Sequence, residues 1–286
     1  MDIGCGFGMN SILMAIYGAS EVACCDFNEE KISVFNKLIA LFENSLKNIK
    51  ICYSHAGNLS FAGDTFTLVL ANDVISHVSD LDRCIHEVFR VLKPGGKFFI
   101  EDGNNLLYFP GRRSQEKHRR QWEEGPVDLQ SVRGTDSPFS YREVRKKIIR
   151  VQYPNISEKM LDFLSRKTRG LYGEKIILVT DELLQTRHTH YHTMFPYRNP
   201  ITGEYQERSF NPIKLCSYIK NHGFQVQILP PAFSYNFTRI RKFFKKTYLS
   251  VFNRFPEISF FAFPYFRLLC TKDRETISLN KCIYCG

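Results

Sequence analysis

The chain opens on a glycine-rich segment, Asp2-Ile3-Gly4-Cys5-Gly6-Phe7-Gly8, in which a glycine occupies every second position. The next apolar run, Val22-Ala23-Cys24-Cys25, ends at the acidic residue Asp26. This order predicts a strand, a glycine turn, a helix, and a second strand with a carboxylate at its tip. Glycine at the turn lets the backbone come close to a ligand. The pattern is typical of a nucleotide-cofactor half-site, and it constrains the fold more than any other feature.

Residues 1–102 alternate between helix and strand signals, and each apolar run is short enough to be a buried strand. Buried strands joined by helices predict a three-layer α/β fold with a doubly wound, mainly parallel, Rossmann-like sheet. The segment Lys93-Pro94-Gly95-Gly96 predicts a turn. Strands are expected over 22–25, 49–53, 68–71 and 97–101, and helices over 11–17, 29–44 and 81–92.

After residue 102 the pattern changes, which predicts a domain of residues 1–102 interrupted by a helical insertion over 103–210. Capping-box sequences at Ser140–Glu143 and Asn155–Glu158 are each expected to open a helix, and a further helix is expected over 174–186. Residues 211–273 are expected to return to the core, with an aromatic and basic insert over 231–264. The predicted core elements are a helix over 211–221 and strands over 223–229 and 265–271, and the tail 274–286 is expected to be poorly ordered.

Charge is unevenly distributed along the chain. Residues 1–102 carry 8 Lys and Arg against 13 Asp and Glu, whereas residues 103–286 carry 31 against 16. A basic face of this kind favours phosphates, a membrane surface or an acidic substrate, and a solvated arginine-rich helical surface explains it equally well.

The cysteine pattern and the hydropathy predict a reducing cytoplasmic location. Of the nine cysteines, Cys24, Cys25, Cys52, Cys84 and Cys270 lie in apolar patterns, where free cysteine behaves as a small hydrophobe. The chain opens on no signal-peptide pattern, and its apolar runs stay below the ~20 residues of a membrane span.

The glycine spacing departs from the G-x-G-x-x-G of dinucleotide sites, because Met9 stands at the third position and Gly8 lies one residue early. Asp2 lies two positions before the first glycine, and a carboxylate there suits a ligand with an ammonium group better than one with a pyrophosphate. Three later segments lie next to predicted strands. His55-Ala56-Gly57 and Asn72-Asp73-Val74 each follow a strand, and Leu92-Lys93-Pro94-Gly95-Gly96 precedes the last strand of residues 1–102.

Taken in order and at these intervals, the motifs of residues 1–102 resemble those of the class I S-adenosylmethionine-dependent methyltransferases, in the type 11-like branch with small-molecule substrates. The resemblance implies S-adenosyl-L-methionine as the cofactor and a seven-stranded sheet whose last strand, over 265–271, runs antiparallel. Family members also carry a helix before the first strand. The resemblance therefore leads us to expect a truncated N-terminus.

The resemblance also implies which residues contact the cofactor. Gly4, Gly6 and their neighbours face the methionine part, Asp26 faces the ribose, and His55 with Ala56 faces the adenine, where family members often place an acid. Asn72 lies beside the methionine at the tip of the fourth strand. The implied cofactor-binding residues are Asp2, Gly4, Cys5, Gly6, Asp26, Phe27, His55, Ala56 and Asn72.

Methyl transfer from a sulfonium mainly requires alignment of the acceptor and exclusion of water, and a hydroxyl acceptor also requires a base. The candidates are His77, after the fourth strand, and Asp102, at the end of the fifth. A packed histidine and a loop-anchoring aspartate explain the same two residues. His188, His190 and His192 alternate along the chain, and Cys282 and Cys285 form a lone pair, but neither set has an evident partner cluster, so no metal site is predicted.

The sequence thus predicts a methyltransferase with a small-molecule acceptor such as a glycan, a lipid or a secondary metabolite. The alternatives are an RNA-directed methyltransferase and a non-catalytic, cofactor-binding relative. Asn72-Asp73-Val74-Ile75 stands where base-amine methyltransferases usually carry Asn/Asp-Pro-Pro-aromatic, so nucleic acid is disfavoured. Residues 231–264 are typical of a helix on an anionic bilayer, of a lid over an apolar acceptor, or of a hairpin packed on the sheet. The oligomeric state is left open.

Overall fold

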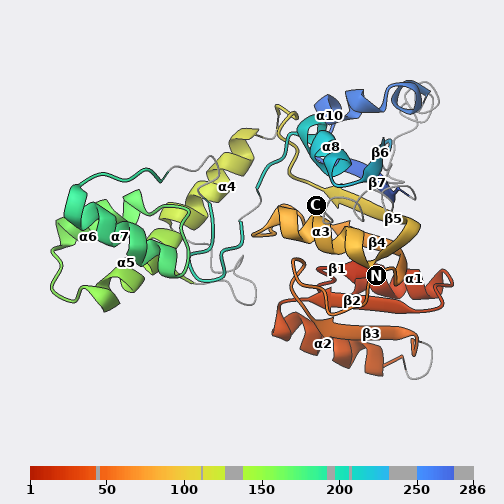
Figure 1. The fold of residues 1–286 in the computed structure, drawn as a ribbon, viewed down its shortest axis with the longest axis horizontal. Coiled ribbons are helices and arrows are strands. Elements are labelled where there is room, and N and C mark those ends of the chain that lie inside the picture. Colours follow the sequence, from red (N-terminus) through yellow and green to blue (C-terminus); the bar gives the residue numbers. More distant parts are fainter. Residues whose placement is uncertain are drawn as a thin grey trace, which may run out of the picture. The chain divides into compact units, whose positions relative to one another are not determined.

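A computed structural model describes residues 1–42, 46–110, 112–125, 138–191, 197–205, 208–231 and 250–273. The chain divides into two compact units (Figure 1). Residues 1–109 and 209–286 form the sheet unit, and residues 110–208 form the helical unit. The sequence-based division instead placed the two limits of the insertion at 103 and 210.

The sheet unit contains the strands and five of the labelled helical segments. Its strands are β1 (Asp2–Ile3), β2 (Val22–Asp26), β3 (Ile49–Tyr53), β4 (Phe66–Asn72), β5 (Leu92–Asp102), β6 (Phe224–Ile228) and β7 (Phe266–Lys272). Its helices are α1 (Met9–Ile16), α2 (Glu29–Ala40), α3 (Leu81–Val91), α8 (Pro212–Asn221) and α10 (Ser259–Ala262), with the 3-10 helix η1 (Pro256–Ile258).

All seven strands form one sheet in the order β3-β2-β1-β4-β5-β7-β6. The β1, β2, β3, β4 and β5 strands pair in parallel, and β7 is antiparallel to both β5 and β6. This confirms the predicted seven-stranded sheet with an antiparallel last strand. The carboxyl ends of the five parallel strands meet at one edge, where sheets of this kind bind ligands.

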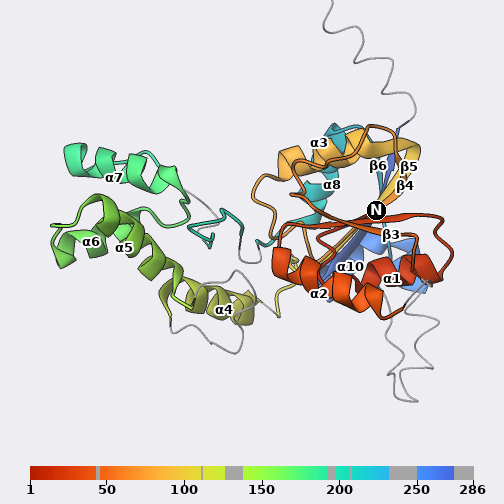
Figure 2. The same ribbon diagram turned by 90° about the horizontal axis from the view of Figure 1, so that it is seen from below.

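Helices cover both faces of the sheet, with α1 and α2 on one side and α3 and α8 on the other (Figure 2). One apolar cluster joins α3 and α8 to β4, β5 and β7, and a second joins α1 and α2 to β2 and β3. All five residues of β2 are buried, because this strand lies inside the sheet and is covered on both faces. The three-layer α/β prediction is therefore confirmed.

Three local predictions were wrong. The segment Lys93–Gly96 does not separate a helix from a later strand, because β5 already starts at Leu92. These four residues form an irregularity in the pairing of β5 with β4, in which Phe66 pairs with Leu92 and Leu68 pairs with Lys97. Helix α2 ends at Ala40 rather than at residue 44. The cap of the helix after residue 155 is Ser157, whose side chain accepts from the Met160 amide, so the expected box at Asn155 does not form.

The helical unit contains α4 (Arg112–Glu124), α5 (Tyr141–Gln152), α6 (Glu158–Lys167) and α7 (Glu174–Thr186). Helix α5 begins at the predicted capping box, in which the Ser140 side chain and Glu143 cap each other's backbone amides. It packs against α4, α6 and α7. The apolar core of the unit consists of Ile149, Leu161, Leu164, Leu171, Ile176 and Leu183.

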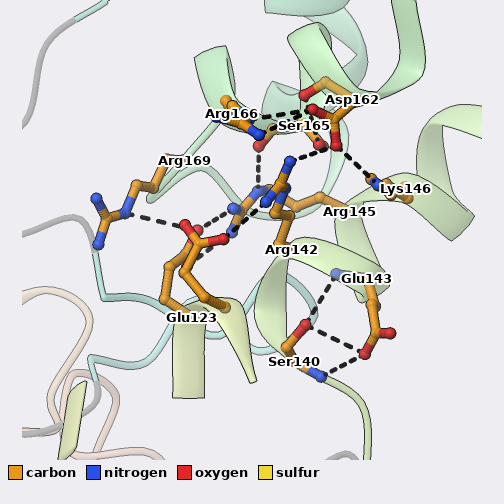
Figure 3. A network of polar contacts seen from close by, with 11 residues as sticks. Glu123, Ser140, Arg142, Glu143, Arg145, Lys146, Asp162, Ser165, Arg166 and Arg169 are labelled. Carbon is orange, nitrogen blue, oxygen red and sulfur yellow. Dashed lines mark hydrogen bonds and ion pairs between the residues drawn. The ribbon is translucent and has the colours of Figure 1, made fainter. Parts of the chain in front are cut away.

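A buried ion pair supplements this small apolar core (Figure 3). The fully buried Arg145 of α5 forms an ion pair with Glu123 of α4, which is 1% exposed, and its Nε donates to the Ser165 carbonyl of α6 at 3.0 Å. Arg169 adds a second guanidinium, with its Nε 3.5 Å from Glu123. Burial raises the pKa of Glu123, although both arginines favour its ionised form. The ion pair and the hydrogen bond to Ser165 connect three helices. Each charge of the pair would be strongly destabilising in this interior without its partner.

We predict that Arg145→Met destabilises the helical unit by about 3–5 kcal/mol, because it leaves the Glu123 carboxylate buried without its main partner. The double variant Glu123→Leu with Arg145→Met removes both charges and is expected to recover most of that loss. Amide hydrogen exchange in α5 and α6 measures the effect, and exchange in β4 and β5 of the sheet unit serves as the internal control. Equal exchange in the single and double variants would contradict this assignment.

Candidate cofactor and active site

Asp26 holds the glycine loop against the end of β2. Its Oδ2 accepts from the Gly6 amide at 2.8 Å, and its Oδ1 accepts from the Asn28 amide at 2.9 Å. Asn28 in turn caps α2, since its side chain accepts from the Lys31 amide at 3.0 Å. The sequence predicts that the glycine turn and the acid at the tip of the second strand belong to one site. In the structure the two are in direct contact. Each carboxylate oxygen keeps a further lone pair with which it can accept from a hydroxyl.

The three glycines of the loop have positive φ angles but different neighbours. A Cβ on Gly4 would lie 2.6 Å from Val74, and a Cβ on Gly8 would lie 1.9 Å from the ring of Phe35 on α2. A Cβ on Gly6 would meet nothing within 4 Å. Gly4 and Gly8 are thus required by packing inside the protein. Gly6 alone leaves the open space that the close approach of a ligand needs.

Asp2 is buried beneath the same loop. Its Oδ2 accepts from the Ser11 hydroxyl of α1 at 2.6 Å, and only 1% of the residue is exposed. Burial raises the pKa of Asp2 to about 6, while the Ser11 hydrogen bond acts in the opposite direction. The carboxylate is therefore costly to ionise in the protein alone, and a cation placed near it would favour ionisation.

Three aromatic side chains, those of Phe27, Tyr53 and His55, lie at the ends of β2 and β3. The half-buried Phe27 stacks on His55 with ring centroids 5.7 Å apart and an interplanar angle of 16°. Tyr53 meets His55 edge to face, with centroids 6.0 Å apart. Ser54 fixes the turn, because its amide donates to the Asp26 carbonyl and its hydroxyl donates to the Asn58 carbonyl. The half-buried Ala56 follows in this turn.

The loops after β4 and β5 are fastened to each other by two carboxylates. Asp102 is fully buried, and it accepts from the Ser76 and Asn104 amides, each at 3.0 Å. Asp73 accepts from the Gly103 amide at 2.9 Å while its own backbone takes a left-handed conformation with φ 51°. Burial raises the pKa of Asp102. These contacts hold the two loops in register.

His77 and Asn72 belong to the same edge. Asn72 is half-buried at the tip of β4, opposite Glu101 of β5, and His77 is half-buried in the loop that Asp102 anchors. The base role expected for His77 or Asp102 stays a prediction, and the geometry of Asp102 favours a loop-positioning role. The structure brings Gly6 of the predicted loop into direct contact with Asp26. Asp2 lies in β1 beneath this loop, Phe27 follows β2, and the other predicted residues lie at the ends of β3, β4 and β5.

Several residues of the site escaped the sequence analysis. Ser11 and Asn28 bond the polar groups of the site but lie outside the recognised motifs. Asp73 lies in the recognised segment Asn72-Asp73-Val74, but the sequence analysis gave it no role. Asp73 alone carried a readable signal, because aspartate directly after a strand tolerates left-handed angles better than most residues.

The other sequence features lie partly within the described residues. No group of three or more His, Cys, Asp or Glu side chains there is placed to hold a metal ion. His192, Cys282 and Cys285 lie outside that part of the chain, as does most of the 231–264 insert and the tail after residue 273. The seven cysteines that the structure describes are free thiols. None of the described helices is long and apolar enough to cross a membrane.

Comparison with known proteins supports the interpretation of the first hundred residues. Residues 1–100 match the family model described as "Methyltransferase domain". A ubiquinone biosynthesis O-methyltransferase from Mesorhizobium japonicum is 36% identical over 107 residues, which is 37% of this chain and 41% of that protein. The protein of the same name from Parvibaculum lavamentivorans has the same identity and coverage. The chain thus spans about two fifths of the length of the curated relatives it matches.

Solved structures that resemble the chain include the YcgJ protein of Bacillus subtilis, with a TM-score of 0.46 and 14% identity over 95% of this chain and 90% of that one. Another is a SAM-dependent methyltransferase from Methanosarcina mazei, with a TM-score of 0.45 and 17% identity over 96% and 92% of the two chains. Residues 1–100 thus match a methyltransferase domain. The sheet order and the glycine loop are those expected of the class I S-adenosylmethionine-dependent methyltransferases, whose cofactor is S-adenosyl-L-methionine.

The residues present fit this cofactor. Gly6 leaves open space at the loop, Asp26 retains acceptor capacity for ribose hydroxyls, and the Phe27–His55 pair offers aromatic surface where the resemblance puts the adenine. The carboxylate of Asp2 lies under the loop, which suits a ligand that carries an ammonium group.

We predict that S-adenosylhomocysteine binds more tightly as the pH rises through about 6, because ionised Asp2 favours the ammonium group of the ligand. Below this pH the affinity should fall by up to about tenfold per unit. Calorimetric titrations between about pH 5 and 7.5 measure the effect. Ser11→Ala should move the midpoint upward by removing a hydrogen bond to the ionised form, and Asp2→Asn should abolish the dependence. A profile that is the same in Asp2→Asn would contradict the role of Asp2.

Proposed function

We propose that this chain transfers a methyl group from S-adenosyl-L-methionine to a small-molecule acceptor. The observation that carries the proposal is the clamp of the Gly6 and Asn28 amides on the Asp26 carboxylate, beside the open space at Gly6. When bound, the cofactor supplies an electrophilic methyl group on a sulfonium, so the protein need not build an electrophile of its own.

The chain's own residues would orient both partners. The loop of residues 4–8 and Asp26 would fix the cofactor, and the loops after β4 and β5, tied by Asp73 and Asp102, would form the wall against which the acceptor aligns. His77 in the anchored loop is the side chain we propose as the base for a hydroxyl acceptor. Its half-buried position at the carboxyl edge of the sheet supports this role.

The acceptor itself is proposed only as a small molecule, such as a glycan, a lipid or a secondary metabolite. The curated relatives are named for an O-methyl transfer in ubiquinone biosynthesis, but their match ends with the cofactor half. In the remaining part of the chain, residues 110–208 form a unit of their own with 19 Lys and Arg against 13 Asp and Glu. Such a unit suits the selection of an acceptor different from those of the relatives.

The first test is the affinity for S-adenosylhomocysteine, measured by calorimetry on the full chain. Asp26→Asn replaces one acceptor oxygen by an amide donor that faces backbone N–H groups, so we expect the affinity to fall about tenfold or more. Asp80→Asn is the matched control, since Asp80 caps α3 with its side chain at an exposed position and asparagine caps equally well. Wild-type protein that does not bind the ligand, or an unchanged affinity in Asp26→Asn, would refute the proposal.

We also propose peripheral contact with an anionic membrane through residues 231–264. In the described part of this segment, Val251, Phe255, Ile258 and Phe261 are 42–57% exposed, whereas Phe252 and Phe260 are buried. Residues 209–286 carry 12 Lys and Arg against 3 Asp and Glu. Exposed apolar side chains beside a basic segment are typical of interfacial binding.

Sedimentation with vesicles of anionic and of zwitterionic phospholipid tests this contact. We expect the wild-type chain to sediment with the anionic vesicles and the double variant Phe255→Ser with Phe261→Ser to remain mostly in solution. Leu178→Ser, which changes a residue that is 64% exposed on α7 of the helical unit, is the control. Equal sedimentation of all three proteins, or of the wild type with both kinds of vesicle, would rule out the contact as described.

A further inference from the structure

Four cysteines of the sheet unit meet in two pairs next to the cofactor edge. Cys25 of β2 and Cys52 of β3 are direct neighbours in the parallel pairing of these strands. Cys5 of the glycine loop and Cys24 of β2 form the second pair, in which the two thiols are hydrogen-bonded. The pairs lie on opposite faces of the sheet. Cys25 and Cys52 belong to the apolar cluster of α3 and α8, and the second pair belongs to that of α1 and α2.

The geometry of Cys25 and Cys52 suits a disulfide bond. Neighbouring strands lie about 4.7–4.9 Å apart, and disulfides usually span Cα separations of about 4.4–6.8 Å. Both side chains point to the same face of the sheet, and their thiols are hydrogen-bonded to each other. The Cys52 Sγ also donates to the Cys24 carbonyl at 3.3 Å, which holds it beside β2. A bond between the sulfur atoms of Cys25 and Cys52 therefore requires little movement of the two strands.

Exposure and acidity differ between the two thiols in the way that thiol oxidation requires. Cys52 is half-buried, whereas Cys25 is 1% exposed. The hydrogen bond between them lowers the pKa of the Cys52 thiol and raises that of Cys25. The thiolate is the form that reacts with an oxidant, and its oxidation depends on access. Cys52 is thus the thiol that reacts first, and Cys25 is the neighbour that attacks the oxidised sulfur.

We propose that Cys25 and Cys52 form a reversible disulfide when the protein encounters hydrogen peroxide. The Cys52 thiolate attacks one peroxide oxygen, so that an S–O bond forms, the O–O bond breaks and hydroxide leaves. The Cys25 sulfur then attacks the Cys52 sulfur, an S–S bond forms, and the S–O bond breaks as the second oxygen leaves as water. The two thiols together lose two electrons and two protons, and one peroxide becomes two water molecules.

The disulfide acts on the cofactor edge because it lies one residue before the ends of both strands. Asp26, which clamps the glycine loop, follows Cys25, and its register partner Tyr53 follows Cys52. Sulfur atoms in a disulfide lie about 2 Å apart, closer than two hydrogen-bonded thiols, so bond formation shifts these strand ends toward each other. We expect the oxidised protein to bind S-adenosylhomocysteine more weakly, and this consequence alone rests on the proposed function.

The pair of Cys5 and Cys24 is an internal control. Its thiols are also hydrogen-bonded, but Cys24 is fully buried and Cys5 is 9% exposed. Because access limits oxidation, we expect both to stay reduced at peroxide concentrations that oxidise Cys52.

The test is peptide mapping of the full chain by mass spectrometry, after treatment with hydrogen peroxide and blocking of the remaining thiols. Trypsin leaves Cys25 on the peptide 1–31, with Cys5 and Cys24, and Cys52 on the peptide 51–83. We expect these two peptides to be linked in the wild type, with fragmentation assigning the bond to Cys25. The link should be absent in Cys25→Ser and in Cys52→Ser, and dithiothreitol should remove it from the wild type. Cys216→Ser, at a buried thiol of α8, should leave it unchanged.

The affinity for S-adenosylhomocysteine is measured by calorimetry on the reduced, oxidised and re-reduced protein. We expect oxidation to weaken binding by the wild type about tenfold, reversibly, and to leave binding by Cys52→Ser unchanged. Thermal unfolding recognises a folding defect in either serine variant, and the mapping of the wild type then decides.

The proposal is overturned if Cys52 stays reduced, or if it is oxidised without forming the link. It is also overturned if the link joins Cys52 to Cys24 or Cys5, or if dithiothreitol does not reverse it. Unchanged affinity in the fully linked protein would overturn the effect on the cofactor edge. A reduced wild type that forms the link on oxidation but never binds S-adenosylhomocysteine would refute the proposed function and leave the disulfide standing.

Discussion

The cofactor edge of the sheet depends on one carboxylate, that of Asp26. Its two oxygens accept from backbone amides that belong to different loops, one in the glycine turn after β1 and one at the start of α2. Hydrogen bonds to a charged acceptor contribute about 1.5–3 kcal/mol each, so the clamp is strong enough to fix the spacing of the two loops without a ligand. The carboxylate that would bind the ribose hydroxyls thus also holds the two loops in place in the protein without a ligand.

The glycine loop shows how a single sequence pattern can combine unrelated requirements. Gly4 makes room for Val74 and Gly8 makes room for Phe35, whereas Gly6 faces open space. Read as a motif, the three positions look equivalent. Only the packing of α2 and of the loop after β4 distinguishes them, and both of those elements lie far along the chain.

Sequence patterns predicted the sheet unit well because its elements are specified locally. Short buried strands and the Asp26 carboxylate at a strand end are readable from a few adjacent residues, as is the Ser140 capping box in the helical unit. The continuation of β5 through Lys93–Gly96 was missed, because pairing with β4 resumes after the irregularity and a turn signal alone cannot reveal that. The Arg145–Glu123 pair was missed for the same reason, since its two partners are on different helices.

Asp102 sets a limit on where the base of the reaction can be. Its carboxylate accepts from the Ser76 and Asn104 amides, one through each oxygen, and it is fully buried. Protonation would neutralise the carboxylate and weaken both hydrogen bonds, because hydrogen bonds to a charged acceptor are the stronger ones. Proton transfer to Asp102 would therefore loosen the contact between the loops after β4 and β5. Anchoring and base catalysis therefore compete at Asp102, which supports the proposal that His77, in a loop that Asp102 holds, is the base.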